Sequence, residues 1–189
     1  MHVALAFNLR QDSGQETESS PAEPPSEPPS PPTGDLYAEW DDIHTIRAVE
    51  SALATRHRVT LVEADLDAFE TFRQLRPDLV FNIAEGLYGN SREAQIPALL
   101  DMLGLPYTGS DPVTLGLCLD KRRTKEILAC HGVATPRFAL VDDIARLPEH
   151  LRFPLMVKPI LEGSSKGVTD SALVADQRAL KRQAEWVLE

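Results

Sequence analysis

A lysine that leads into a loop of glycines and serines is the feature of this sequence best suited to chemistry. Lys158 follows an apolar segment, and the loop after it reads Glu162-Gly163-Ser164-Ser165-Lys166-Gly167. Glycine lets a backbone approach a ligand closely, while backbone N–H groups, serine hydroxyls and a lysine ammonium attract phosphate oxygens. The segment therefore favours polyphosphate binding, although it contains no GxxxxGKS/T Walker loop. Taken alone, it fits an ordinary hairpin equally well, because glycines also serve turns.

A second group of lysines opens a predicted helix. Asp120 is suited to cap that helix, Lys121 could reach a nucleotide phosphate from its first turn, and Lys125 follows one turn later. Charged residues on a helix usually form a solvated face, which is the favoured interpretation of both lysines taken alone.

Polar residues follow a predicted strand at residues 79–81. Asn82 and Glu85 come after its carboxyl end, where open α/β sheets bind ligands, so they are candidates to hold a substrate amine or hydroxyl. No metal site is predicted, because the histidines lack metal-ligand spacing and the two cysteines form no CxxC motif.

Apolar and amphipathic segments in the first half of the chain must position these residues. Strands are predicted at residues 3–7, 59–62 and 79–81, with helices at 37–57 and 64–75 between them. Alternation of strand and helix implies right-handed crossovers and a parallel sheet. The predicted fold class for this half is α/β with a Rossmann-like sheet.

One helix in the middle of the chain has conflicting start signals. It is predicted at residues 90–103, closed by Gly104, and Asn90 and Glu93 have the spacing of a capping box. Pro97 conflicts with a regular helix from residue 91. The helix therefore either starts later, with Pro97 in its first turn, or kinks there.

The remainder of the chain predicts a small α+β lobe. One helix runs from its cap Asp120 to Gly132, with Ile127 and Leu128 facing inward, and another from its cap Asp176 to about residue 188. Strands are predicted at residues 138–141, 153–158 and 167–174.

Composition narrows the class of protein. The 189 residues, 42% of them hydrophobic, suffice for a packed core. The formal net charge is −10, but residues 11–35 hold six of the 29 acidic residues and no Lys or Arg, so the rest is only mildly acidic. No basic stripe is present, which disfavours nucleic-acid binding. Without a membrane-length apolar segment or the basic region of a signal peptide, the chain is predicted to be cytoplasmic.

Residues 11–35 are predicted to be a disordered insertion. Seven of the 15 prolines lie within residues 19–32, mixed with serine and glutamate. This composition cannot bury enough apolar surface to offset the entropy of ordering. A tolerated surface insertion is favoured over a ligand for a proline-reading domain.

Residues 81–168, taken together, resemble the D-alanine–D-alanine ligase branch of the ATP-grasp superfamily. The order and spacing of the segments are specific, although no single segment is. The matching segments are residues 104–110 (GLPYTGS), 119–121 with 124–125, 132–133 with 135–136, 153–159 (FPLMVKP) and 162–165 (EGSS). The strand–helix repeats before residue 81 fit the family more loosely.

The resemblance implies a preATP-grasp domain at residues 1–118 and a truncated ATP-grasp small lobe, the ATP lid, at residues 119–189. It implies that residues 162–167 form a flexible loop closing over the triphosphate of ATP. The residues implied to bind ATP are Lys121, Lys158, Glu162, Gly163, Ser164, Ser165 and Gly167, and Ser164 is also the implied catalytic residue that helps to place the substrate.

The resemblance also implies a reaction. The family activates a carboxylate as an acyl phosphate and lets an amine attack it, with Mg²⁺ neutralising charge, in the synthesis of cell-wall peptidoglycan. The expected substrates are amino-acid-like small molecules, contacted here by Glu85 and Asn82, and a homodimer is compatible with the resemblance.

Four departures from the family pattern bear on the substrate. Phe7-Asn8-Leu9-Arg10 stands where the family has Gly-Gly-x-Ser-x-Glu, so the usual carboxylate for the amine of the first D-alanine is missing. Glu85 replaces a histidine, Leu161 an arginine and Lys166 a small apolar residue. D-alanine is therefore left open as the substrate, while a related carboxylate–amine ligation is expected.

The resemblance places the Mg²⁺ ligands and the adenine-contacting strand of the family beyond Glu189. Ligation by these 189 residues alone is therefore not expected. The competing class is a non-catalytic module that binds a nucleotide or a partner, and a third class is an interaction protein that uses the proline-rich tract.

Overall fold

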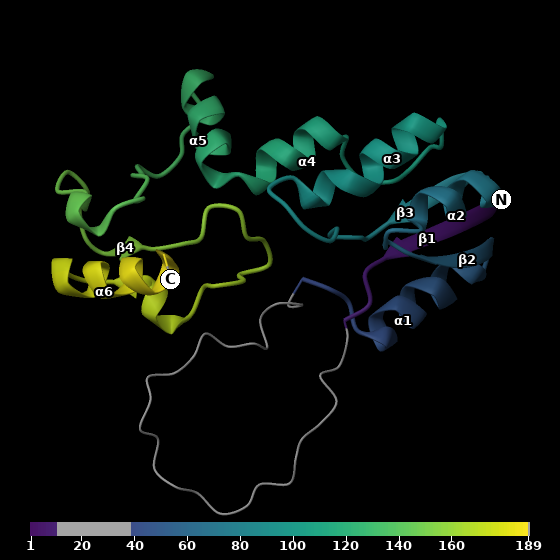
Figure 1. The fold of residues 1–189 in the computed structure, drawn as a ribbon, viewed down its shortest axis with the longest axis horizontal. Helices are drawn as coiled ribbons and strands as arrows, with labels where there is room; N and C mark the ends of the chain where they lie inside the picture. The colour runs from purple at the N-terminus through teal and green to yellow at the C-terminus, as the bar shows by residue number, and fades with distance from the viewer. Residues whose placement is uncertain (11–38, 189) are drawn as a thin grey trace, which may run out of the picture. The chain divides into compact units, whose positions relative to one another are not determined.

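The computed structural model describes residues 1–10 and 39–188, and Figure 1 shows their helices and strands. The predicted insertion at residues 11–35 and the first residues of the predicted helix 37–57 lie outside the described residues. The chain divides into two compact units. The first unit comprises Met1–Gly86 and Leu99–Gly109, and the second comprises Leu87–Ala98 and Ser110–Glu189.

A three-stranded parallel sheet forms the centre of the first unit. Its strands are β1 (His2–Phe7), β2 (Arg58–Glu63) and β3 (Leu79–Asn82), in the order β2-β1-β3. In the middle strand, Leu5 is paired with Leu61 on one side and with Phe81 on the other. Residues 3–7 of β1 are all buried, as expected of a parallel strand covered on both faces. The predicted α/β class and parallel sheet are confirmed.

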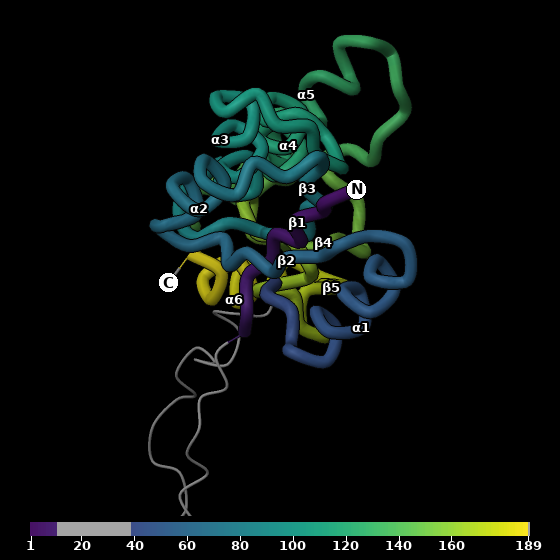
Figure 2. The backbone as a smooth tube through the Cα atoms, turned by 90° about the vertical axis from the view of Figure 1, so that its right-hand side faces the viewer, coloured from purple at the N-terminus to yellow at the C-terminus, as the bar shows by residue number. Residues whose placement is uncertain are grey.

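Two helices cover opposite faces of this sheet, as the views in Figures 1 and 2 agree. They are α1 (Ile43–Ala54) and α2 (Ala68–Leu75). Ile46 of α1 packs with Leu5 in a core cluster, and Phe72 of α2 is fully buried. A left-handed Arg76 ends α2. The predicted start of α2 at residue 64 is four residues early, because a turn precedes the helix.

Helix α3 (Gln95–Leu103) follows a 3-10 turn, η2 (Arg92–Ala94), and the boundary between the units falls within it. Pro97 lies in its first turn, where a missing N–H costs nothing. The alternative in which the helix starts later, with Pro97 in its first turn, is confirmed. The capping box at Asn90 is wrong, since the helix begins five residues later and Ser91 caps η2 without a side-chain hydrogen bond.

The second unit contains three further helices: α4 (Pro112–Leu119), α5 (Lys121–Cys130) and α6 (Gln177–Leu188). Besides η2, it has two further 3-10 turns, η3 (Ile144–Arg146) and η4 (Asp170–Ala172). Asp120 caps α5 and a left-handed Gly132 follows it, as predicted. The prediction that Ile127 and Leu128 face inward is wrong, because no residue of α5 is buried.

The strands of the second unit are far shorter than predicted. β4 (Leu155–Met156) and β5 (Leu173–Val174) form an antiparallel pair of two residues each. Residues 138–141 form no strand. Prolines 154 and 159 flank β4 and cannot donate to a ladder, which limits that strand. The predicted division at 118/119 into two family domains stays a prediction.

Among the described residues, no helix combines the length and the apolar character that crossing a bilayer requires.

Candidate functional site

A hollow of about 290 Å³ in the second unit brings the predicted ATP-binding residues together. Lys121, Lys158, Glu162, Gly163, Ser164 and Ser165 line it, together with Glu93, Cys118, Leu119, Pro159, Lys166 and Val168. Gly167, the remaining predicted residue, belongs to the same loop but does not line the hollow. We call this cavity the loop hollow. Lys121 and Glu162, which are 41 positions apart in the sequence, thus meet at one place. The role of these residues in binding stays a prediction.

Lys121 ties the start of α5 to the start of the glycine loop. Its ammonium donates to the carbonyl oxygen of Glu162, and its backbone N–H donates to the carbonyl oxygen of Ile160 over 3.2 Å. The interpretation of Lys121 as part of a solvated face is therefore wrong. In this structure its charge serves the loop backbone.

Lys125 braces the segment that follows α5. Its ammonium donates to Thr135 Oγ1 over 2.8 Å and to the carbonyl oxygen of Pro136 over 2.9 Å, and it lies 5.4 Å from the centre of the Phe138 ring. Lys125 is therefore not on a solvated face either, and it does not line the loop hollow.

Lys158 lies two residues after β4, and its side chain is exposed at the loop hollow. Within the described part of the chain, its ammonium makes no hydrogen bond and no ion pair. Lys158 thus presents its charge to any ligand of the hollow.

The loop itself holds left-handed backbone at residues other than glycine. Ser164 has φ 44° and Ser165 has φ 65°. Each such residue costs on the order of 1–3 kcal/mol, and strain of this kind gathers at ligand sites. Gly167 has φ 68°, and a Cβ atom there would stand 2.7 Å from Pro159 Cγ, so only glycine fits.

A buried arginine that the sequence did not single out anchors the loop. Arg92 Nη1 donates to the carbonyl oxygen of Leu161 over 2.8 Å, and Arg92 Nη2 lies 3.1 Å from Glu162 Oε2. Lys166 Nζ lies 3.2 Å from the same carboxylate oxygen. No local pattern could have revealed Arg92, since its partners lie 69 and 70 positions further along the chain.

The predicted substrate residues Asn82 and Glu85 belong to the first unit. Asn8, fully buried, orders this strand end: its Oδ1 accepts hydrogen bonds from the N–H groups of Glu85 (3.0 Å) and Gly86 (2.9 Å). The Oδ1 atom of Asn82 accepts from the N–H of Ala84 over 3.2 Å, so this amide supports its own turn. Asn8, which stands in the segment where the family pattern is lost, therefore positions the backbone at Glu85.

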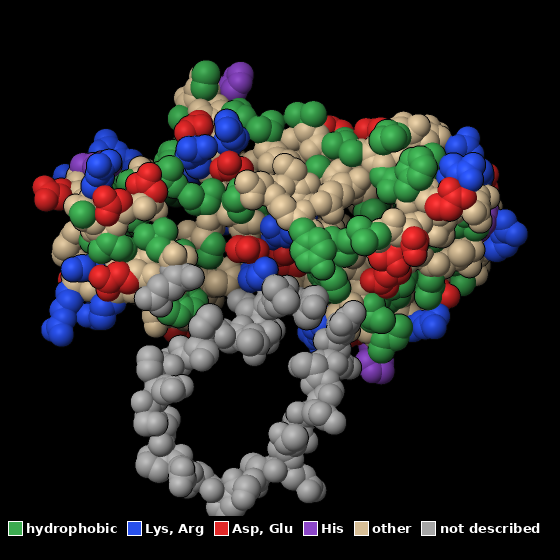
Figure 3. Space-filling view, in the orientation of Figure 1, with side chains coloured by type: hydrophobic (Ala, Val, Ile, Leu, Met, Phe, Trp, Pro, Cys, Tyr) green, Lys and Arg blue, Asp and Glu red, His purple; other side chains and the backbone are tan. Residues whose placement is uncertain are grey.

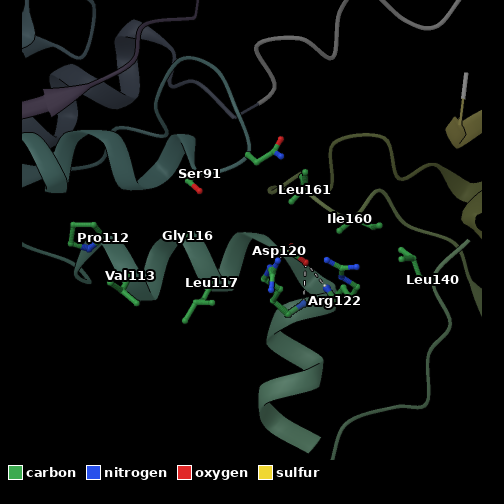
Figure 4. A pocket seen from close by; sticks show the side chains of 12 residues that line it. Ser91, Pro112, Val113, Gly116, Leu117, Asp120, Arg122, Leu140, Ile160 and Leu161 are labelled. Atoms are coloured by element: carbon green, nitrogen blue, oxygen red, sulfur yellow. Dashed lines mark hydrogen bonds and ion pairs between the residues drawn. The ribbon is translucent and has the colours of Figure 1, made fainter. Parts of the chain in front are cut away.

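A larger pocket of about 620 Å³ lies next to the loop hollow in the same unit (Figure 4). Ile160 and Leu161 line the pocket, while their neighbours Pro159 and Glu162 line the hollow, so one stretch of chain separates the two. Figure 4 shows the Asp120 carboxylate in this pocket, where it accepts hydrogen bonds from the N–H groups of Arg122 and Arg123 in the first turn of α5.

A third hollow of about 590 Å³ lies between α6 and η3. Arg178, Lys181 and Arg182 line it together with Glu149 and Glu185. Figure 3 shows basic and acidic side chains mixed at this end of the second unit. The mixed charge gives the hollow no preference for an anion.

Among residues 1–10 and 39–188, no group of three or more His, Cys, Asp or Glu side chains could hold a metal ion. Among the described residues, the Mg²⁺ that the resemblance implies therefore has no cluster of three or more such side chains to hold it.

No family model matches the chain, but its sequence is similar to several D-alanine–D-alanine ligases and to one uncharacterized protein. A D-alanine–D-alanine ligase of Sphingopyxis alaskensis is 36% identical over 132 residues, which cover 69% of this chain and 41% of the ligase. An uncharacterized protein, y4sG of Sinorhizobium fredii, is 38% identical over 120 residues, or 59% of this chain and 36% of that protein.

The fold gives the same result. The structure of a D-alanine–D-alanine ligase of Bacillus anthracis complexed with ATP matches with a TM-score of 0.65 at 20% identity, covering 100% of this chain and 55% of that one. The chain spans about two fifths or less of the length of these curated relatives. Its sequence resembles D-alanine–D-alanine ligases, and its fold matches about half of such an enzyme.

Proposed function

We propose that this chain, similar in sequence to D-alanine–D-alanine ligases, is the N-terminal, phosphate-binding part of an ATP-dependent carboxylate–amine ligase of the ATP-grasp type. The observation that carries the proposal is the loop hollow, where Lys121, Lys158 and residues 162–165 converge. Lysine ammonium groups, serine hydroxyls and backbone N–H groups around one hollow suit the triphosphate of ATP.

In the proposed reaction, a substrate carboxylate attacks the terminal phosphorus of ATP, giving an acyl phosphate and ADP. A substrate amine then attacks the acyl carbon, and inorganic phosphate leaves. Lys158 offsets the charge of the moving phosphoryl group, and the loop excludes water when it closes over the hollow. Ser164 helps to place the substrate.

The proposed substrates are amino-acid-like small molecules, with Glu85 and Asn82 as their contacts in the first unit. Glu85 is held through its backbone N–H by the buried Asn8. The carboxylate of Glu85 is the group proposed to bind the substrate, because a carboxylate suits an amine. The replaced segment at residues 7–10 leaves the identity of that amine open.

Nucleotide titration by isothermal calorimetry tests the proposal. We expect the 189-residue chain to bind ATP, and Lys158→Ala to lower the affinity by about tenfold or more, since a charge-assisted contact contributes roughly 1.5–3 kcal/mol. Lys181→Ala is the matched control, because Lys181 is an exposed lysine on α6 that does not line the loop hollow. Equal ATP affinity of Lys158→Ala and the parent chain would contradict the proposed site.

An assay of ADP formation separates the proposal from a non-catalytic nucleotide-binding module. Both bind ATP through the loop hollow, but only a ligase forms ADP when the chain works together with the remainder of such an enzyme. ATP binding without ADP formation in that assembly, across a panel of amino acids, would favour the binding module.

A further inference from the structure

We propose that Lys166 is an additional phosphate-binding lysine, stored on Glu162 while the loop hollow is empty, and that Arg92 allows its release. The inference rests on the proposed function, in which the loop hollow takes a polyphosphate. It gives a role to the charge at Lys166 and to the buried Arg92.

Lys166 is placed to reach a ligand. It lines the loop hollow, and 20% of its side chain is exposed. Its backbone N–H donates to the carbonyl oxygen of Gly163 over 2.8 Å, so the loop folds back and brings Lys166 beside Glu162. Within the described residues, the ion pair with Glu162 is the interaction of its ammonium.

Two cations share one oxygen of Glu162. Arg92 Nη2 lies 3.1 Å and Lys166 Nζ lies 3.2 Å from Oε2. One carboxylate neutralises only one of the two positive charges. Lys166 therefore shares its counter-ion with Arg92, and a phosphate anion in the loop hollow can take over its ammonium.

Arg92 is the cation that stays bound to Glu162 when Lys166 leaves. Its side chain is only 10% exposed, and it also donates to the carbonyl oxygen of Leu161. A guanidinium with two directed hydrogen bonds is fixed, whereas an ammonium on a flexible stem can turn to a new anion. If Lys166 leaves, Glu162 keeps the charge of Arg92, so no carboxylate is left half-buried without a counter-ion.

The state of Lys121 explains why another lysine is useful. Its ammonium is engaged with the carbonyl oxygen of Glu162, one residue after the carbonyl that Arg92 holds. Lys121 and Arg92 thus fix the start of the loop, and Lys158 and Lys166 supply the charge that faces the hollow.

Calorimetric titrations of ATP and AMP test the role of Lys166. We expect Lys166→Met to weaken ATP binding by about tenfold and to leave AMP binding within about twofold, since a terminal-phosphate contact is lost. Lys166→Arg should restore ATP binding, because it keeps the charge. Unchanged ATP affinity in Lys166→Met overturns the inference, and so does an equal loss for ATP and AMP, which would indicate a merely structural role.

A double-mutant cycle tests the role of Arg92. Arg92→Met should weaken ATP binding because Lys166 must then stay on Glu162, and adding Lys166→Met should cost little more. Fully additive losses overturn this coupling. If Arg92→Met does not fold, Glu162→Gln replaces it: freeing Lys166 should raise ATP affinity, and adding Lys166→Met should remove that gain. A loss of ATP affinity in Glu162→Gln that Lys166→Met leaves unchanged overturns the release mechanism.

The two proposals fail in different ways. ATP binding that depends on Lys158 but not on Lys166 overturns only the inference about Lys166. A parent chain that binds no ATP overturns both.

Discussion

Different interactions stabilise the interior of each of the two compact units of this chain. In the first unit, every residue of β1 from Val3 to Phe7 is buried between two helices. In the second unit, Met156 and Leu173 are paired across β4 and β5, yet 53% and 60% of these residues are exposed. Burial of apolar surface therefore stabilises the first unit far more than it stabilises this part of the second.

Around the glycine loop, hydrogen bonds from charged side chains to the backbone hold the segments together. Arg92, Lys121 and Lys125 each bind backbone carbonyl oxygens of segments distant in sequence. Such hydrogen bonds fix a few points and constrain the residues between them less, which suits the proposed closing of the loop over a ligand. The difference between the units indicates that the first is a scaffold and that the second carries the movable part of the proposed site.

The largest expected effect comes from truncating a buried side chain of the sheet. Leu5→Ala should lower the free energy of unfolding by about 2–5 kcal/mol, because it removes a fully buried side chain and leaves a cavity. Leu173→Ala, in the exposed pair, should cost under about 1 kcal/mol. Urea denaturation measures both, and equal losses would remove the distinction between the units.

A glycine of the loop should give an intermediate effect. Gly167→Ala meets both a positive φ of 68° and the Pro159 ring, whereas Gly132→Ala meets a φ of 69° with nothing within 4 Å. The left-handed backbone alone costs roughly 1–2 kcal/mol. Gly167→Ala should therefore destabilise the second unit more than Gly132→Ala does in thermal unfolding. Equal shifts in the two melting temperatures would show that Pro159 gives way freely.

The same contrast explains which elements could be predicted from the sequence. A strand buried on both faces needs a continuous apolar run, which is a local signal, and β1 was predicted within one residue. Phe138 and Leu140 gave a similar signal without forming a strand. Whether a segment pairs depends on a neighbouring strand elsewhere in the chain, and the second unit supplies few such partners.

Helix α4 was not predicted from the sequence, although the residues at its start are typical of a helix N-terminus. Asp111 followed by Pro112 is a cap and a first-turn proline, and Asp111 does accept from the N–H of Val113. The apolar residues of α4 alternate instead of following helical spacing. The glycine loop could be predicted because its glycines and serines are close together in the sequence. Arg92 could not, because it contacts the loop only in the folded chain.

The smallest expected effect is a difference in pH dependence between acids of the two units. Burial raises the pKa of Glu63, at the end of β2, above its ordinary value of 4.5. The hydroxyl and N–H of Thr114 lower the pKa of Asp111, at the start of α4, below 3.8. The stability contributed by Glu63 is thus present below pH 4.5 and lost as the pH rises through its folded pKa. That of Asp111 is present above pH 3.8 and lost as the pH falls through its folded pKa.

Neutral variants should reverse these trends. Glu63→Gln keeps an oxygen for the N–H of Leu9, so it should become more stable than the parent chain as the pH rises above 4.5. Asp111→Asn should become less stable than the parent as the pH rises toward and above 3.8. Urea midpoints from pH 3 to pH 7 measure both differences. If the stability differences of both variants from the parent chain had the same sign, burial would not disfavour the charged form of Glu63. The contrast in pH dependence between the two units would then be wrong.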